Sequence, residues 1–157
     1  MNKGFTLIES IVVITIIVVL SSVILFTVNQ YIAKGKDASV KGNLVILVAA
    51  GETFFNGPGN DSYEGFCSSN VVLKAVEQIS KPATELDCSS GATPGLCCYV
   101  ETLTGTYNSW AACAQLFTNN LWAYCIDSRG VKQEICNSSC TPTINKCPDD
   151  NLNSCSS

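Results

Sequence analysis

The stretch that decides how this chain folds is residues 5–33, FTLIESIVVITIIVVLSSVILFTVNQYIA. It holds no charged residue between Ser10 and Ala33, and its one charged side chain is Glu9. As a helix, the 24 residues from Phe5 to Val28 would extend about 36 Å, more than the roughly 30 Å hydrocarbon core of a bilayer. The sequence therefore predicts one apolar helix that is long enough to span a membrane.

The helical pattern continues through residues 34–55, KGKDASVKGNLVILVAAGETFF, but becomes one-sided. Apolar and small residues recur at helical spacing and form a single stripe, which predicts a face that packs under a globular head: Val40, Leu44, Leu47, Val48, Gly51, Phe54 and Phe55.

Polar residues are expected to lie largely off that stripe: Lys36, Asp37, Lys41, Asn43 and Glu52. Gly51 lies on the stripe, where a close approach of another element would explain it. We expect one helix from Phe5 to about Phe55, ended by the breaker cluster of residues 56–59, Asn-Gly-Pro-Gly.

Cysteines mark the remainder of the chain as a different kind of structure. All ten fall after residue 66 of the 157: Cys67, Cys88, Cys97, Cys98, Cys113, Cys125, Cys136, Cys140, Cys147 and Cys155. So many thiols predict a disulfide framework outside the reducing cytosol. The spacing leaves the pairing open among about 945 possibilities. Metal binding by thiolates is the rival interpretation, but the chain has no C-x-x-C pair.

Several classes of function are disfavoured by composition. The chain has no histidine, which removes His-based triads, general bases and metal sites. Its net charge of −4 is the wrong sign for binding nucleic acid by counterion release. Cys97-Cys98 has neither redox-motif spacing nor a basic neighbour. We predict no enzymatic activity and no cofactor; Asp149 and Asp150 are weak calcium candidates in a polar tail.

The head is predicted to combine a short helix with an antiparallel sheet. Residues 71–79 are typical of a helix, and Trp110, Trp122 and Tyr124 are expected in the core or on a sheet face. Four apolar stretches separated by turn signals predict three or four strands in a meander, one face of which covers the helix stripe: residues 96–103, 110–117, 121–127 and 131–136.

The sequence K-G-F-T-L-I-E at residues 3–9 resembles the prepilin signature of type IV pilins and the related type II secretion pseudopilins. The resemblance implies that a membrane peptidase cuts after Gly4 and methylates the new N-terminal residue, Phe5. It also implies that Glu9 pairs with the N-terminal amine of a neighbouring subunit during filament assembly. The family commonly carries a proline within the apolar run, whereas this chain has none before Pro58.

Simple electrostatics supports a pairing role for Glu9. Cleavage before Phe5 leaves an ammonium at the tip of an apolar helix, near one carboxylate. Each charge is costly alone in lipid or in a filament core, and the two compensate when paired. Because Glu9 is four residues from Phe5, the pair could also close within one helix.

The resemblance and the residues together predict a type IV pilin-like α+β fold, with one long N-terminal helix packed on a small disulfide-bonded β-meander head. The expected divisions are a leader (1–4), an apolar helix (5–33), its amphipathic continuation (34–56) and a cysteine-rich head (57–157). The implied function is a subunit of a surface filament, made in the bacterial inner membrane. Its implied partners are other pilin subunits, the prepilin peptidase/methyltransferase, the pilus assembly machinery and the membrane. The alternatives are a pseudopilin, a minor pilin, or a membrane-anchored extracellular binding module that does not polymerise.

Overall fold

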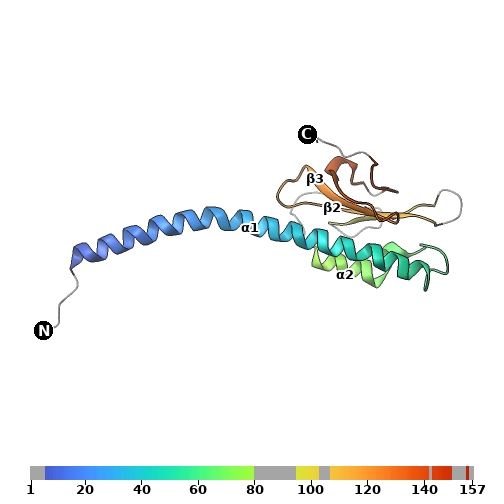
Figure 1. Ribbon diagram of the computed structural model, residues 1–157, viewed down its shortest axis with the longest axis horizontal. Helices are drawn as coiled ribbons and strands as arrows, with labels where there is room; N and C mark the ends of the chain where they lie inside the picture. The colour runs from blue at the N-terminus through green and yellow to red at the C-terminus, as the bar shows by residue number, and fades with distance from the viewer. Residues whose placement is uncertain (1–5, 80–94, 103–106, 142, 150–154, 156–157) are drawn as a thin grey trace.

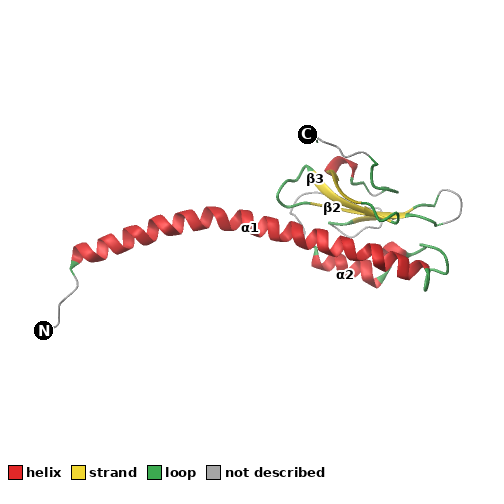
Figure 2. Cartoon of the chain, viewed as in Figure 1, coloured by secondary structure: helices red, strands yellow, loops and turns green. Residues whose placement is uncertain are grey.

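The computed structural model describes residues 6–79, 95–102, 107–141, 143–149 and 155. One long helix, α1, projects from a head in which a sheet lies over the C-terminal half of the helix (Figure 1). A second helix, α2 (Asn70–Gln78), lies beside α1. Two short 3-10 helices complete the head, η1 (Phe66–Ser68) and η2 (Asn137–Ser139). Figure 2 shows the separation of helical and strand layers, which confirms the predicted α+β fold.

Helix α1 runs without interruption from Leu7 to Phe55. Its C-terminal cap is Asn56, whose backbone N–H donates to the Glu52 carbonyl at 3.1 Å. Gly57 then donates to the Phe54 carbonyl, and Pro58, which lacks an N–H group, follows in the turn. The helix therefore ends where the breaker cluster predicted.

The sheet is an antiparallel meander whose spatial order is the chain order: β1 (Cys97–Val100), β2 (Trp110–Gln115), β3 (Trp122–Asp127) and β4 (Lys132–Cys136). Strand β2 begins beside Gly51 of α1 and ends just before Phe117, which contacts Asp37. Strand β2 thus runs opposite to α1. The β2–β3 loop (residues 116–121) consequently lies at the end of the head nearest the projecting half of α1.

The main core lies between the helices and one face of the sheet. Alternating residues of β2 point toward α1, as the two-residue period of a strand requires. Fully or almost fully buried side chains from all three elements meet there: Val40, Leu44 and Leu47 of α1, Val72 and Ala75 of α2, and Trp110, Ala112, Ala114 and Ile126 of the sheet.

Gly51 allows α1 to approach the sheet closely. A Cβ atom at this position would lie 2.7 Å from Nε1 of Trp110, a side chain that is 0% exposed. Any side chain at residue 51 would have to displace the indole. This contact supplies the close approach expected for a glycine on the packed stripe.

Gly51→Ala should therefore destabilise the head. The substitution gains up to about 1 kcal/mol of helix propensity, whereas overpacking a closed core costs about 1–3 kcal/mol. We expect a net loss of about 1 kcal/mol in the free energy of unfolding, measured by urea titration of tryptophan fluorescence. Gly42→Ala is the matched control, since nothing lies within 4 Å of a Cβ there. Equal stability of the two variants would contradict the assigned role of Gly51.

The other face of the sheet is covered by the chain that follows β4. Cys97, Cys113 and Cys125 are directly opposite one another in register and form a row across β1, β2 and β3. Disulfides join Cys113 to Cys140 and Cys125 to Cys147, so two members of the row hold the returning segment. A third bond, Cys136–Cys155, holds the chain further on. Ile135 and Ile144 complete this second core.

Tyr63 connects the turn after α1 to the main core and is 5% exposed. Its hydroxyl donates to Oε1 of Glu52 at 3.0 Å. Burial, followed by the hydrogen bond and the charge of Glu52, raises the pKa of Tyr63 from 10.0 to about 12. The folded state therefore favours the protonated phenol.

This raised pKa predicts a loss of stability in alkali. The stabilisation is complete below pH 10 and is lost as the pH rises through about 12. Tyr63→Phe should flatten this alkaline decline in the free energy of unfolding, measured by urea titration at successive pH values. Tyr31→Phe is the control, because Tyr31 is 72% exposed on α1. An unchanged alkaline slope in Tyr63→Phe would refute the assignment.

Candidate assembly site on the N-terminal helix

The projecting half of α1 exposes a continuous apolar surface. Exposed fractions of its described leucine, isoleucine and valine side chains run from 41% at Val28 to 77% at Leu7. Within the described residues, α1 is the one helix long and apolar enough to cross a membrane, and none of its most apolar window is buried. Patches of this size on soluble proteins mark interaction sites. This surface requires lipid or another protein to cover it.

The beginning of α1 is fixed by a reciprocal capping box. Thr6 is the N-cap, and its Oγ1 accepts from the Glu9 backbone N–H at 3.4 Å. In return, Oε2 of Glu9 accepts from the Thr6 backbone N–H at 2.9 Å and from the Thr6 hydroxyl at 2.7 Å. The T-x-x-E spacing of residues 6–9 is a sequence signal for this cap. Gly4 and Phe5 lie outside the described residues.

The cap leaves Glu9 able to accept a further partner. Both bonds from Thr6 end on Oε2, and Glu9 is exposed on the helix surface. The box satisfies two donors of the first helical turn but supplies no positive charge. A carboxylate in an apolar environment is stabilised most by a cation. The geometry therefore fits a pairing in which Glu9 accepts from an ammonium group.

Hydroxyl groups along the apolar half bond back to the helix without breaking it. Thr15 donates to the Val12 carbonyl at 2.8 Å, and Ser22 donates to the Val19 carbonyl at 2.7 Å. Such bonds bend helices slightly, and Figure 1 shows a gentle curve in this half of α1. The helix is continuous here, in keeping with the absence of proline before Pro58.

The structure brings the predicted stripe against the head. Val40, Leu44 and Leu47 are 1%, 0% and 0% exposed, and Gly51 contacts Trp110. The other three stripe residues are half-buried and pack against the same core: Val48, Phe54 and Phe55.

The expectation that Asp37 lies off the stripe was wrong. Its side chain is 7% exposed, because residue 37 is three positions before Val40 and therefore in phase with the apolar residues. Its Oδ1 accepts from the Phe117 backbone N–H at 2.5 Å, and its Oδ2 accepts from the Thr118 N–H at 3.2 Å. The Thr118 hydroxyl also donates to Oδ2. Asp37 thus anchors the β2–β3 loop to α1.

The adjacent cysteines 97 and 98 point to opposite faces of β1. Cys98 bonds Cys67 on the helical side, and Cys97, on the tail side, is also disulfide-bonded. The sulfur atoms of Cys97, Cys113 and Cys140 lie within 4.8 Å of one another. Because all three are in disulfides, they offer no thiolate to a metal. Cys88 lies outside the described residues.

A buried carboxylate that sequence reasoning missed holds the β3–β4 turn to the tail. Asp127 is 1% exposed and accepts from the Arg129 guanidinium at 2.6 and 2.9 Å, and from the Cys147 backbone N–H at 3.1 Å. Arg129 also donates to Oδ1 of Asp149 at 2.6 Å, and Lys146 donates to Oδ2 at 3.0 Å. These bonds hold the pKa of Asp149 below its usual value. A calcium ion at Asp149 would have to displace both cations; Asp150 lies outside the described residues.

Residues 1–25 match the family model described as "Prokaryotic N-terminal methylation motif", which is the type IV pilin and prepilin signature. No curated protein and no solved structure matches the chain. The molecule therefore carries the prepilin signature on a pilin-like α+β fold with an apolar N-terminal helix and disulfide bonds. Proteins with this motif are structural rather than enzymatic. The motif implies processing by a prepilin peptidase and assembly into pilus-like filaments, and it fits membrane insertion before assembly.

Proposed function

We propose that this protein is a structural subunit of a type IV pilus-like surface filament and polymerises through α1. The observation that carries the proposal is the contrast between the two halves of α1. The C-terminal half is packed under a head whose sheet is covered on both faces, whereas the N-terminal half exposes its apolar side chains all round. A surface that is apolar on every side fits a lipid environment first and a filament core afterwards.

Burial of this surface drives α1 out of water and into lipid. Each leucine, isoleucine or valine side chain removed from water contributes about 1.5–3 kcal/mol. Transfer from lipid to a filament core gains far less, because lipid tails are as apolar as the side chains. Packing and polar pairing therefore determine whether subunits leave the membrane, and this gives Glu9 its importance.

In the proposed mechanism, a prepilin peptidase cleaves after Gly4, and Phe5 becomes the methylated N-terminal residue. The released ammonium of one subunit pairs with Glu9 of its neighbour. Thr6 keeps the Glu9 carboxylate at the helix tip through the capping box. The capped geometry supports this pairing because the second carboxylate oxygen stays available to the incoming amine.

Each division of the chain has its own role in this function. Residues 1–4 are the leader, residues 5–33 the membrane and assembly helix, residues 34–56 its docking continuation and residues 57–157 the exposed head. The partners are further copies of the chain, the peptidase/methyltransferase and the pilus assembly machinery. The protein resides in the bacterial inner membrane until it enters the surface filament.

Intact mass and N-terminal sequencing of the native protein, combined with fractionation of sheared cells, test this function. A chain that begins at methylated Phe5 and is recovered in sheared filaments is the expected result. A chain that begins at Met1 would overturn the processing step. A processed chain found only as a membrane monomer would indicate an anchored binding module, and a processed chain in short periplasmic assemblies would indicate a pseudopilin.

A further inference from the structure

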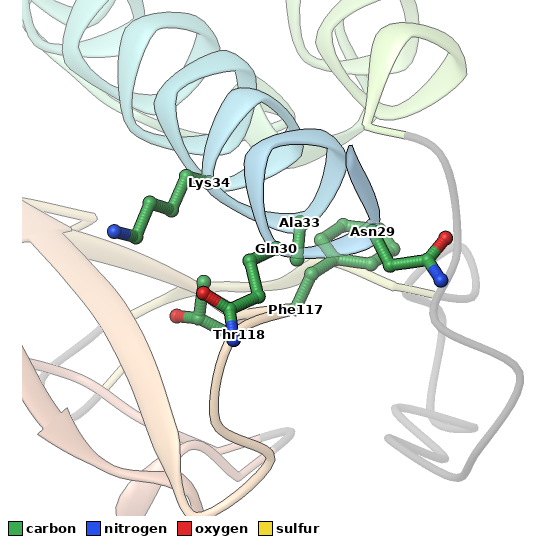
Figure 3. Close-up of a pocket in the computed structure, with 6 residues that line it drawn as sticks. All are labelled: Asn29, Gln30, Ala33, Lys34, Phe117 and Thr118. Carbon is green, nitrogen blue, oxygen red and sulfur yellow. The ribbon is translucent and has the colours of Figure 1, made fainter. Parts of the chain in front are cut away.

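A groove lies where α1 leaves the head. It has a volume of about 430 Å³ and is lined by Asn29, Gln30, Ala33 and Lys34 of the helix and by Phe117 and Thr118 of the β2–β3 loop. Figure 3 shows the Gln30 amide, the Thr118 hydroxyl and the Phe117 ring gathered between the helix and the loop, with Asn29 and Lys34 extending to opposite sides. We call this feature the neck groove.

The neck groove lies in the most basic part of an acidic protein. Residues 34–41 contain three lysines and one aspartate, whereas residues 42–157 contain five basic and eleven acidic residues. The aspartate, Asp37, is engaged with the β2–β3 loop, and Lys41 pairs with Glu134 at 2.6 Å. Lys36 lies over the Phe117 ring, 4.9 Å from its centroid. Among the described residues, Lys34 has no carboxylate within ion-pair distance, so its charge is available to a ligand.

The length of the apolar run places the neck groove at the membrane surface. From Leu7 to Val28 the helix is long enough to fill a hydrocarbon core of roughly 30 Å. Lys34 follows Val28 by about 9 Å along the axis, next to a headgroup layer that extends about 5–8 Å beyond each side of the core. Tyr31, three residues before Lys34 and 72% exposed, is a side chain suited to such an interface.

We infer that the neck groove binds the headgroup of an anionic phospholipid of the membrane that α1 spans. Lys34 neutralises the phosphate, the Gln30 amide donates a hydrogen bond to one of its oxygens, and Ala33 and Phe117 contact the glycerol and the first acyl carbons. The inference rests on the proposed function only in requiring that α1 spans a membrane. Binding here would hold the acidic head in one orientation above the bilayer before assembly.

Charge and depth favour a lipid over a second copy of the chain as the occupant. The surface of a second head is acidic overall, but its neck would bring the same lysines together at the same depth. A phospholipid phosphate supplies the opposite charge at that depth, and its acyl chains continue along the exposed apolar face of α1.

The test uses the full chain in nanodiscs of mixed phosphatidylcholine and phosphatidylglycerol, with the retained lipids counted by native mass spectrometry. One lysine near an anionic surface changes binding by about fivefold, so the wild type should retain phosphatidylglycerol preferentially and Lys34→Gln should reduce that preference about fivefold. Gln30→Ala should reduce it about twofold or more. Lys132→Gln is the control for charge, because Lys132 is exposed at the opposite end of the sheet.

Further variants distinguish lipid binding in the neck groove from attraction to a diffuse basic surface. Lys36→Gln removes the same charge two residues away without removing a lining residue, so its effect should be smaller than that of Lys34→Gln. Equal effects of Lys34→Gln and Lys36→Gln on the lipid preference, with no effect of Gln30→Ala, would overturn the proposal that the lipid binds in the neck groove. Displacement by inorganic phosphate at constant ionic strength would overturn the assignment to a lipid. If the preference for phosphatidylglycerol disappears in nanodiscs that hold one copy of the chain, the groove would instead be an interface between copies.

Failure of this inference is distinguishable from failure of the proposed function. A chain that does not insert into nanodiscs would overturn both. An inserted chain whose Lys34→Gln variant keeps the wild-type lipid ratio would overturn only the lipid site. Absence of the protein from sheared filaments, with the lipid preference intact, would overturn only the filament role.

Discussion

Filaments should be lost when Glu9 is replaced by alanine, while the head stays folded. In the proposed assembly, the variant leaves the N-terminal ammonium of the neighbouring subunit without a partner, and breaking a buried ion pair by removing one member costs about 3–5 kcal/mol. A penalty of this size at every subunit contact would reduce assembly by more than about a hundredfold. The readout is the amount of protein in the sheared fraction, compared with the amount in the membrane.

Two variants separate charge from helix capping in this experiment. Glu9→Gln keeps an oxygen that can accept from Thr6 but removes the charge, so it should also fail to assemble. Thr6→Val removes the hydroxyl from the capping box and keeps the Glu9 charge, so it should weaken assembly much less. Normal filaments from Glu9→Ala, with correctly processed N-termini, would refute the pairing mechanism.

The sequence predicted those elements whose limits depend on local chemistry. Helix α1 ends at Phe55 because the residues after it form a turn and include Pro58. The four strands lie within the four apolar stretches, since turn residues such as Gly130, at φ 79°, separate them. Periodicity and turn residues act over a few positions, so one sequence reveals them.

The disulfide pairing could not be predicted from the sequence because it depends on the register of the paired strands. Cys97, Cys113 and Cys125 form their row only after β1, β2 and β3 pair with the offsets that the structure shows. A shift by one residue would turn every side chain of a strand to the other face. The bonded cysteines of two disulfides are 27 and 22 residues apart in the sequence, and these separations do not reveal the register.

Asp37 shows a different limit. Its helical phase with the apolar residues was visible in the sequence, but whether its side chain is buried or solvated was not. An aspartate in phase with Val40 and Leu44 is either a solvated residue at the edge of a stripe or a buried acceptor. The choice depends on what lies opposite, namely the N–H groups of Phe117 and Thr118. Those donors are 80 and 81 residues away in the chain, and no local signal connects them to the helix.

Asp37→Ala should destabilise the head by about 2–4 kcal/mol, because three donors of the β2–β3 loop lose a charged acceptor at a nearly buried site. The free energy of unfolding from urea titration measures the loss, and hydrogen exchange at the Phe117 and Thr118 amides should accelerate. Asp37→Asn keeps one acceptor oxygen and should lose about half as much.

Glu77→Ala is the matched control for Asp37→Ala, because it also removes one carboxylate from a helix but at an exposed position of α2. It should change stability by no more than about 0.5 kcal/mol. Similar values for the two variants would mean that the loop is held by packing of Phe117 rather than by Asp37. The larger loss expected for Asp37→Ala follows from geometry, since this carboxylate accepts three hydrogen bonds that connect α1 to the β2–β3 loop.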